Sequence, residues 1–280
     1  MGRVTERGMN SRSSIEWPML RPFIILWRHR KLLARTTVSD LKMRFAGSVL
    51  GVGWLILQPL LLLAAYSAVY LVIFNIRFSG LTNIEYVAFM FCGLVPFLGF
   101  AESLSAGIDS LTSQTALIKN SLFPIEMVPV KAVLAAQAKQ MVGIVGIFLG
   151  VAVVGDWHWT SLFVIPLWGL QVVFMIGLAW LLAPINTYVR DLHSLAGLAT
   201  SFLMIISPIA YAPEMVPEGL KGALLCNPLY YMIVPWQEAV VRGLFPRVEL
   251  WGVFAVMSFA VFFGGFLFFT RLRSVVVDHV

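Results

Sequence analysis

Charged side chains are scarce in this sequence, and that scarcity sets the class of protein. Asp, Glu, Lys and Arg make up 12% of the 280 residues, whereas a typical soluble domain has about 25%. Hydrophobic residues make up 59%, and the mean hydropathy is +0.86. Because a soluble protein of this composition would expose large apolar patches, we expect an all-α polytopic membrane protein. The apolar runs are too long and continuous for the alternating strands of a β-barrel.

Motifs for nucleotide, metal and acyl-transfer chemistry are missing as well. No lysine is followed by Ser or Thr, which excludes the GxxxxGK[ST] phosphate-binding loop. The sequence has no HExxH, CxxC or G-x-S-x-G pattern, and its two cysteines make no disulfide framework. The chain is therefore expected to be no enzyme and to bind no cofactor or metal. The first 20 residues also lack the compact apolar core of a cleavable signal peptide.

Six stretches with few charges are predicted to be transmembrane helices, each of which needs roughly 20 apolar residues. They are Phe45–Ile76, Tyr86–Ile108, Val130–Val154, Leu162–Ala183, the shorter Leu195–Tyr211, and Trp251–Thr270. Six spans place both termini on one side, and most of the 20 Lys and Arg residues flank the spans on that side. The positive-inside rule then predicts cytoplasmic termini. The net charge of +6 is explained by topology and lipid headgroups, so we expect no nucleic-acid partner.

The chain divides into a cytoplasmic N-terminal segment (1–46), a transmembrane domain (47–270) and a cytoplasmic tail (271–280). Between Arg21 and Arg44, apolar residues recur mostly at three- and four-residue steps with cations between them. This pattern predicts an amphipathic helix lying on the membrane surface. The alternative is an ordinary basic flank that only fixes topology. The cations expected to meet anionic headgroups are Arg28, Arg35, Lys42 and Arg44.

Two connections are unusual. The region near 212–245, within the long connection Ala212–Leu250, has apolar patches too short to span, and the connection contains five prolines. This predicts re-entrant or interfacial helices at the outer face before the last span. The connection near 112–125 can form a short cytoplasmic helix that exposes Leu, Ile and Phe and ends at a rigid bend around Pro124. Such a helix suits docking of a soluble partner; an ordinary turn is the alternative.

Carboxylates within the predicted spans are candidate functional groups, because a charge in the membrane interior is costly. Glu102 and Asp109 lie seven residues apart, so one helical face can carry both. They are expected to mark the cytoplasmic end of the helix or to line a wet cavity.

Three motifs resemble permeases of ATP-binding-cassette transporters of the polysaccharide-export type. Leu41-Lys42-Met43-Arg44-Phe45, followed by Ser48, Leu50-Gly51, Trp54 and Gln58-Pro59-Leu60, is similar to the family's approach to the first span, with Phe45 where Tyr is common. Asn120 to Pro129 is similar to the Phe-Pro-x-Glu segment after the coupling helix, and Asn186 to Asp191 resembles the Asn-x-x-x-Arg-Asp turn after the fourth span.

The resemblance implies a half-transporter of the bacterial inner membrane. Two copies would pair as a homodimer and export a lipid-linked polysaccharide such as O-antigen, capsule or teichoic acid. Two separate ATPase subunits would bind ATP and Mg, consistent with the missing phosphate-binding loop. The interfacial helix would guide the lipid-linked end, so Arg28, Arg35, Lys42 and Arg44 would meet either lipid headgroups or the pyrophosphate of the substrate at its entry. The re-entrant helices would form the outer gate. The residues expected to dock the ATPase subunit are Thr115, Leu117, Ile118, Lys119, Phe123 and Glu126.

Aromatic side chains in the first span are candidates for the polymer path, because sugar rings stack on aromatic faces. The candidates are Trp54, Tyr66, Tyr70 and Phe74; each of them alternatively faces lipid or packs in the core. The competing functions are a drug or small-lipid exporter permease of the same superfamily, a membrane-embedded transferase and a membrane scaffold. A transferase would need a polar, titratable cluster at one membrane face, which the sequence does not indicate.

Overall fold

The computed structural model describes residues 21–45, 47–74, 81–114, 124–154 and 157–279, and the described chain is helical without a strand. Five helical segments are long and apolar enough to cross a membrane. They are Trp54–Ile73, Asn83–Ile108, Met127–Ala152, Trp159–Tyr188 and Val248–Arg273. The prediction of an all-α membrane protein is thus confirmed. The fifth predicted span is a shorter apolar helix, Leu192–Ile206, so the count of six spans stays a prediction.

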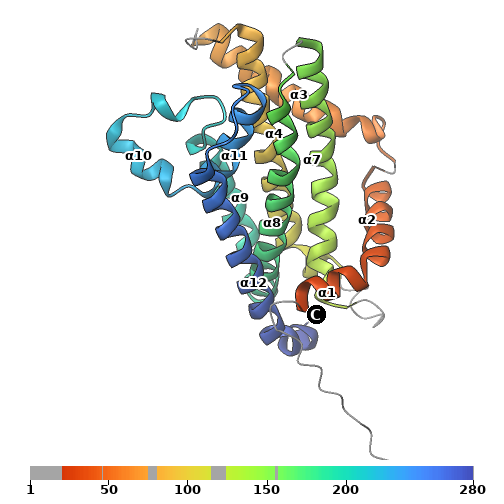
Figure 1. Ribbon diagram of the computed structural model, residues 1–280. Helices are drawn as coiled ribbons and strands as arrows, with labels where there is room; N and C mark the ends of the chain where they lie inside the picture. The colour runs from red at the N-terminus through yellow and green to blue at the C-terminus, as the bar shows by residue number, and fades with distance from the viewer. Residues whose placement is uncertain (1–20, 46, 75–80, 115–123, 155–156, 280) are drawn as a thin grey trace, which may run out of the picture.

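The core of the bundle consists of α4 (Asn83–Ile108), α7 (Met127–Val154), α8 (Val164–Tyr188) and α12 (Val248–His279) (Figure 1). Helices α8 and α12 cross where two glycines meet: a Cβ on Gly177 would lie 2.5 Å from the backbone of Phe262, and one on Gly265 would lie 2.1 Å from the carbonyl oxygen of Gly177. Small residues at such a crossing let two helix backbones approach closely, which is a common way of packing helices in membranes.

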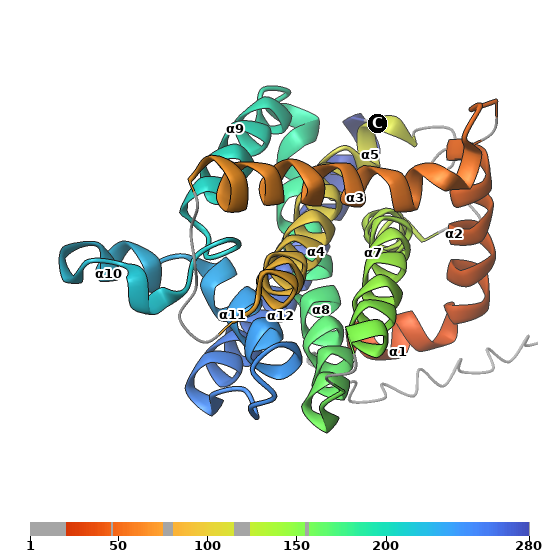
Figure 2. The same cartoon turned by 90° about the horizontal axis from the view of Figure 1, so that it is seen from above.

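The first span consists of α3 (Trp54–Ser67) and a π-helical segment, Ala68–Ile73. It runs across one flank of the bundle, past α4 and α7 (Figure 2). None of its residues is buried within this chain. It covers the bundle without being enclosed by it.

The N-terminal segment forms two helices, where the sequence predicted one amphipathic helix. Helix α1 (Arg21–Arg28) lies at the same end of the bundle as the last turns of α12 (Figure 1), and the Phe23 ring packs 5.2 Å from that of Phe262. Helix α2 (Arg30–Phe45) packs beside α7. Only α1 has its apolar side chains gathered on one face. We call this end of the bundle the α1 end.

The region before the last span contains two short helices, α10 (Glu218–Leu225) and α11 (Pro228–Val240). Helix α11 is buried along nearly its whole length and packs against α4, α8 and α12. Helix α10 projects from the side of the bundle (Figures 1 and 2). The predicted helices therefore exist, and their re-entry into the membrane stays a prediction.

Candidate functional site

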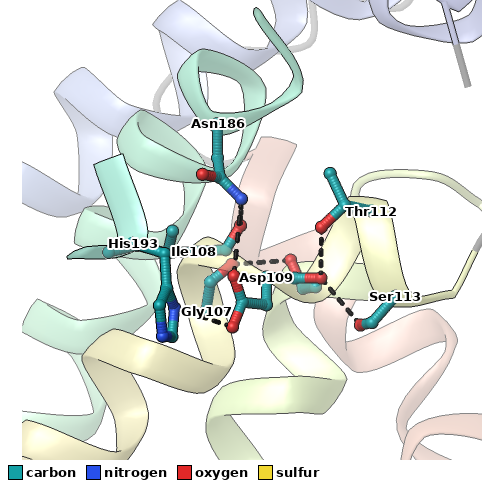
Figure 3. A network of polar contacts seen from close by, with 8 residues as sticks. Gly107, Ile108, Asp109, Thr112, Ser113, Asn186 and His193 are labelled. Atoms are coloured by element: carbon teal, nitrogen blue, oxygen red, sulfur yellow. Dashed lines mark hydrogen bonds and ion pairs between the residues drawn. The ribbon is translucent and has the colours of Figure 1, made fainter. Parts of the chain in front are cut away.

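Side-chain clamps fasten the helices to one another at the α1 end. The first clamp centres on Asp109, at the end of α4 (Figure 3). Asn186 of α8 donates from Nδ2 to the Ile108 carbonyl oxygen at 3.2 Å and to Asp109 Oδ1 at 3.5 Å. His193 Nδ1, in α9 (Leu192–Ile206), lies 2.9 Å from Asp109 Oδ2. The family-like turn that starts at Asn186 thus joins the ends of α4, α8 and α9.

The second clamp is built on Lys131, whose side chain is only 2% exposed. Its Nζ lies 2.8 Å from Asp40 Oδ2 of α2 and donates to Gln114 Oε1 at 3.0 Å. A buried ammonium is costly unless it is paired and hydrogen-bonded, and here both conditions are met. The Lys131 side chain thus holds α2 against α7. It also anchors Gln114, the last described residue before 115–123.

The third clamp lies after residues 115–123, at the start of α7. Glu126 is buried, and its Oε1 accepts a hydrogen bond from Arg273 Nη1 of α12 at 2.7 Å. The fully buried Trp180 of α8 donates from Nε1 to the Glu126 carbonyl oxygen at 2.8 Å. Its ring also lies 5.1 Å from that of Phe262. The start of α7 is thereby fixed to both α8 and α12.

Most residues expected to dock an ATPase subunit lie outside the described residues: Thr115, Leu117, Ile118, Lys119 and Phe123. The remaining one, Glu126, points into the third clamp and not to solvent. The structure therefore describes both flanks of the connection near 112–125, each fastened to the bundle, and the docking role of the whole set stays a prediction.

The cations expected at the membrane surface lie on α1 and α2. Arg28 and Arg35 are exposed, and the neighbouring Arg30 guanidinium lies over the Trp27 ring at 4.4 Å. The side chains of Lys42 and Arg44 are outside the described part of the chain. The exposed cations stand beside exposed Ile24 and Trp27, which is the composition of a helix in the headgroup layer.

Two of the four predicted path aromatics line one cavity. Tyr66 and Tyr70 stack with their ring centroids 5.9 Å apart, and both line a 280 Å³ cavity between the first span and the end of α9. The cavity's third tyrosine, Tyr211, was missed from the sequence because it follows a different helix. Phe74 stands edge-on to Tyr70 and is 62% exposed, and Trp54 is 42% exposed. Trp54 does not line this cavity.

The two intramembrane carboxylates share a second cavity, as their seven-residue spacing predicted. Glu102 and Asp109 both line a 720 Å³ cavity at the α1 end, together with Asp40 and Lys131. Glu102 is ion-paired with Lys139 of α7. Among the described residues, no group of three or more His, Cys, Asp or Glu side chains could hold a metal ion.

Comparison with known proteins finds relatives along most of the chain. It is 27% identical over 248 residues to the O-antigen export system permease protein RfbA of Klebsiella pneumoniae, covering 86% of this chain and 92% of the relative. It is 24% identical to the Myxococcus xanthus protein of that name, covering 94% and 100%. Identity to the polysialic acid transport protein KpsM of Escherichia coli is 23%, covering 74% and 80%. No protein-family model matches the chain. The resemblance seen in the three motifs is confirmed: the chain is similar over most of its length to permeases of ATP-binding-cassette polysaccharide exporters.

Proposed function

We propose that this chain is the membrane-spanning permease subunit of an ATP-driven polysaccharide exporter. The observation that carries the proposal is the likeness to polysaccharide-export permeases along most of the chain, supported by five membrane-length helices. The substrate is a lipid-linked polysaccharide, which moves from the cytoplasm across the bacterial inner membrane. The α1 end is the cytoplasmic end, so both termini are cytoplasmic.

ATP hydrolysis is supplied by a separate ATPase subunit, two copies of which carry the ATP and Mg. The permease has no phosphate-binding loop of its own. The ATPase docks on the connection near 112–125, whose flanks are Gln114 and Glu126. Because both flanks are clamped to other helices, movement of this connection reaches α2 on one side and α12 on the other. The chain itself performs no covalent chemistry.

Two copies of the chain form the working permease. The first span and α9 support this assignment, since neither has a buried residue within one copy. They expose large apolar side chains that include Leu60, Leu61, Leu198 and Phe202. A contiguous exposed apolar surface marks a contact with lipid or with another protein. We place the second copy on these two helices, and the tyrosine-lined cavity between them on the polymer path.

The proposed function is tested by deleting the chromosomal gene in cells that make a surface polysaccharide. Loss of surface polysaccharide, with lipid-linked polymer accumulating on the cytoplasmic side, is the expected result, and a plasmid copy restores export. Normal surface polysaccharide together with altered drug tolerance or phospholipid distribution would instead identify a drug or small-lipid exporter and overturn the proposal.

A further inference from the structure

A cavity with a partly polar wall lies beneath α3, inside the membrane-spanning part of the bundle. Its volume is 310 Å³, and its walls come from α3, α4 and α7. Polar side chains from all three helices reach it: Gln58, Glu102, Ser105, Lys139 and Gln140. At 1.5 Å per residue, Glu102 lies about 9 Å inside the end of α4. The cavity is distinct from the tyrosine-lined one, with which it shares no residue.

The cavity is part of a series that follows one face of the first span. It adjoins the 720 Å³ cavity at the α1 end, because Glu102 and Ser105 line both. The residues of the first span that line it, Leu55, Gln58 and Pro59, continue as Leu62, Ala65, Tyr66, Val69 and Tyr70 along the tyrosine-lined cavity. Steps of three and four residues keep these side chains on one helical face. The 720 Å³ cavity at the α1 end therefore adjoins this cavity, and the tyrosine-lined cavity comes next along the first span.

The cavity presents hydrogen-bonding groups without a net positive charge. Glu102 and Lys139 form an ion pair in its wall, which offers acceptors and donors side by side. In this cavity and the adjoining one together, three carboxylates (Asp40, Glu102, Asp109) face two ammonium groups. A phosphate or pyrophosphate would meet an excess of negative charge there. Uncharged ligands are favoured.

Gln140 is held in a fixed orientation in the same wall. Its Nε2 donates to Gln171 Oε1 at 2.8 Å, and Gln171 Nε2 donates to the Pro96 carbonyl oxygen at 2.9 Å. Gln140 Oε1 is buried and has no hydrogen-bond donor among the described residues. It rests against Gly99, where a Cβ would lie 1.7 Å from it. The Gln140 amide is therefore taken up by the packing of the wall, and the groups left to bond a ligand are those of Gln58, Ser105 and the Glu102–Lys139 pair.

We propose that this cavity binds sugar residues of the exported polymer through their hydroxyl groups, at a point before the polymer reaches the tyrosines. The proposal rests on the proposed function. A pyranose ring has hydroxyls at its edge and C–H groups on its faces, and the cavity pairs its polar wall with apolar Leu55, Pro59 and Val95. An acyl chain would match only the apolar part of this wall and would make no hydrogen bond to Gln58 or Ser105. The cavity has no aromatic platform, so each sugar is held weakly and the polymer can advance.

Thiol accessibility in whole cells tests occupancy of the cavity. Ser105→Cys places a thiol where the two cavities meet, and the native exposed Cys226 serves as an internal reference. The complete exporter is treated with N-ethylmaleimide in cells that make the polymer and in cells that lack the first glycosyltransferase of its synthesis. Polymer is expected to reduce labelling at position 105 severalfold relative to Cys226. Equal labelling in both strains while export proceeds normally would overturn the sugar site and leave the proposed function standing.

A paired substitution tests the chemistry of the site. Glu102 and Lys139 form a partly exposed ion pair. Since even a buried pair can often be replaced by apolar residues without loss of stability, Glu102→Leu with Lys139→Leu should fold and insert. We expect this variant to export polymer severalfold more slowly, while Glu102→Gln with Lys139→Gln retains more of the rate because amides still bond hydroxyls. The matched control is Glu214→Leu with Arg242→Leu, an ion pair outside all three cavities. Wild-type export by the Glu102→Leu/Lys139→Leu variant would refute the site.

Discussion

The first two spans are alike in sequence and opposite in structure. Both are long, apolar and nearly free of charge, yet no residue of Trp54–Ile73 is buried, whereas 15 of the 26 residues of Asn83–Ile108 are buried. Apolar composition alone therefore predicts that a segment is removed from water. It does not predict whether lipid or protein surrounds the segment. Helix α4 is covered by its own chain. The first span needs lipid, a second copy or the passing substrate to cover it.

Glycines explain why α4 is enclosed. A Cβ on Gly93 would lie 2.9 Å from the Cα of Ile209, and one on Gly107 would lie 2.8 Å from the Cβ of Ala179. These positions let neighbouring backbone approach α4 closely. The first span has no glycine between Trp54 and Ile73 and carries large exposed side chains instead. The first span therefore lies on the outside of the bundle, and α4 lies inside it.

The largest effect is expected when a β-branched side chain is added to the enclosed helix. Gly93→Val forces the added atoms into the backbone at Ile209 and into Gln237 Nε2; such overpacking costs roughly 1–3 kcal/mol, occasionally more. We expect a lower melting temperature and less monodisperse protein in size-exclusion chromatography. The matched control is Gly169→Val in α8, where a Cβ would meet nothing within 4 Å; this variant should leave both unchanged. Equal losses in the two variants would mean that close packing at Gly93 is not what encloses α4.

The next effect concerns coupling at the α1 end. Glu126→Arg brings two like charges together with Arg273, and Arg273→Glu pairs two carboxylates; each should uncouple ATP hydrolysis from export. Because Arg273 is half exposed and Glu126 is near the helix end, the exchanged pair Glu126→Arg/Arg273→Glu should regain much of the coupling. The measurement is polymer exported per ATP hydrolysed in reconstituted vesicles. If the exchanged pair lost as much coupling as the two single variants together, the Glu126–Arg273 contact would not contribute to coupling.

The stretches with few charges predicted the five membrane-length helices of the described chain, because their length is itself the physical requirement for crossing a bilayer. The ion pairs could not be predicted from the sequence. Lys131 and Asp40 lie on different helices, and Glu126 lies in the turn before α7 while Arg273 lies on α12. A single sequence carries no signal of which charges meet. The shared face of Glu102 and Asp109 could be predicted because helical spacing fixes it. Tyr211 could not, since the loop that brings it to Tyr66 has no periodicity.

A smaller effect is expected from the tyrosine-lined cavity. Tyr66→Leu and Tyr211→Leu remove stacking surfaces worth about 1 kcal/mol each, so export should slow severalfold with little change in thermal stability. Tyr86→Phe is the control with the opposite expectation. Its hydroxyl donates to the Ala210 carbonyl oxygen at 2.6 Å and does not line the cavity, so its loss should lower the melting temperature and spare the export rate. Unchanged export in both leucine variants would remove these two tyrosines from the polymer path.

The smallest effect concerns the region around α10. Like the first span, α10 is mostly exposed, with one buried residue. Glu214 accepts two hydrogen bonds from Arg242, at 3.2 and 3.3 Å. Partial burial alone would raise the pKa of Glu214, but the hydrogen bonds and charge of Arg242 outweigh it and hold the pKa below its ordinary value. A lowered pKa in the folded protein stabilises it above the carboxyl's ordinary pKa of about 4.3, and this stabilisation is lost as the pH falls through the folded-state pKa.

Because Glu214 is 57% exposed, the change in stability with pH should be slight. Melting temperatures across this acidic range should fall a little less for Glu214→Gln than for the wild type, and a steeper fall in the variant would show that the pair does not stabilise this region.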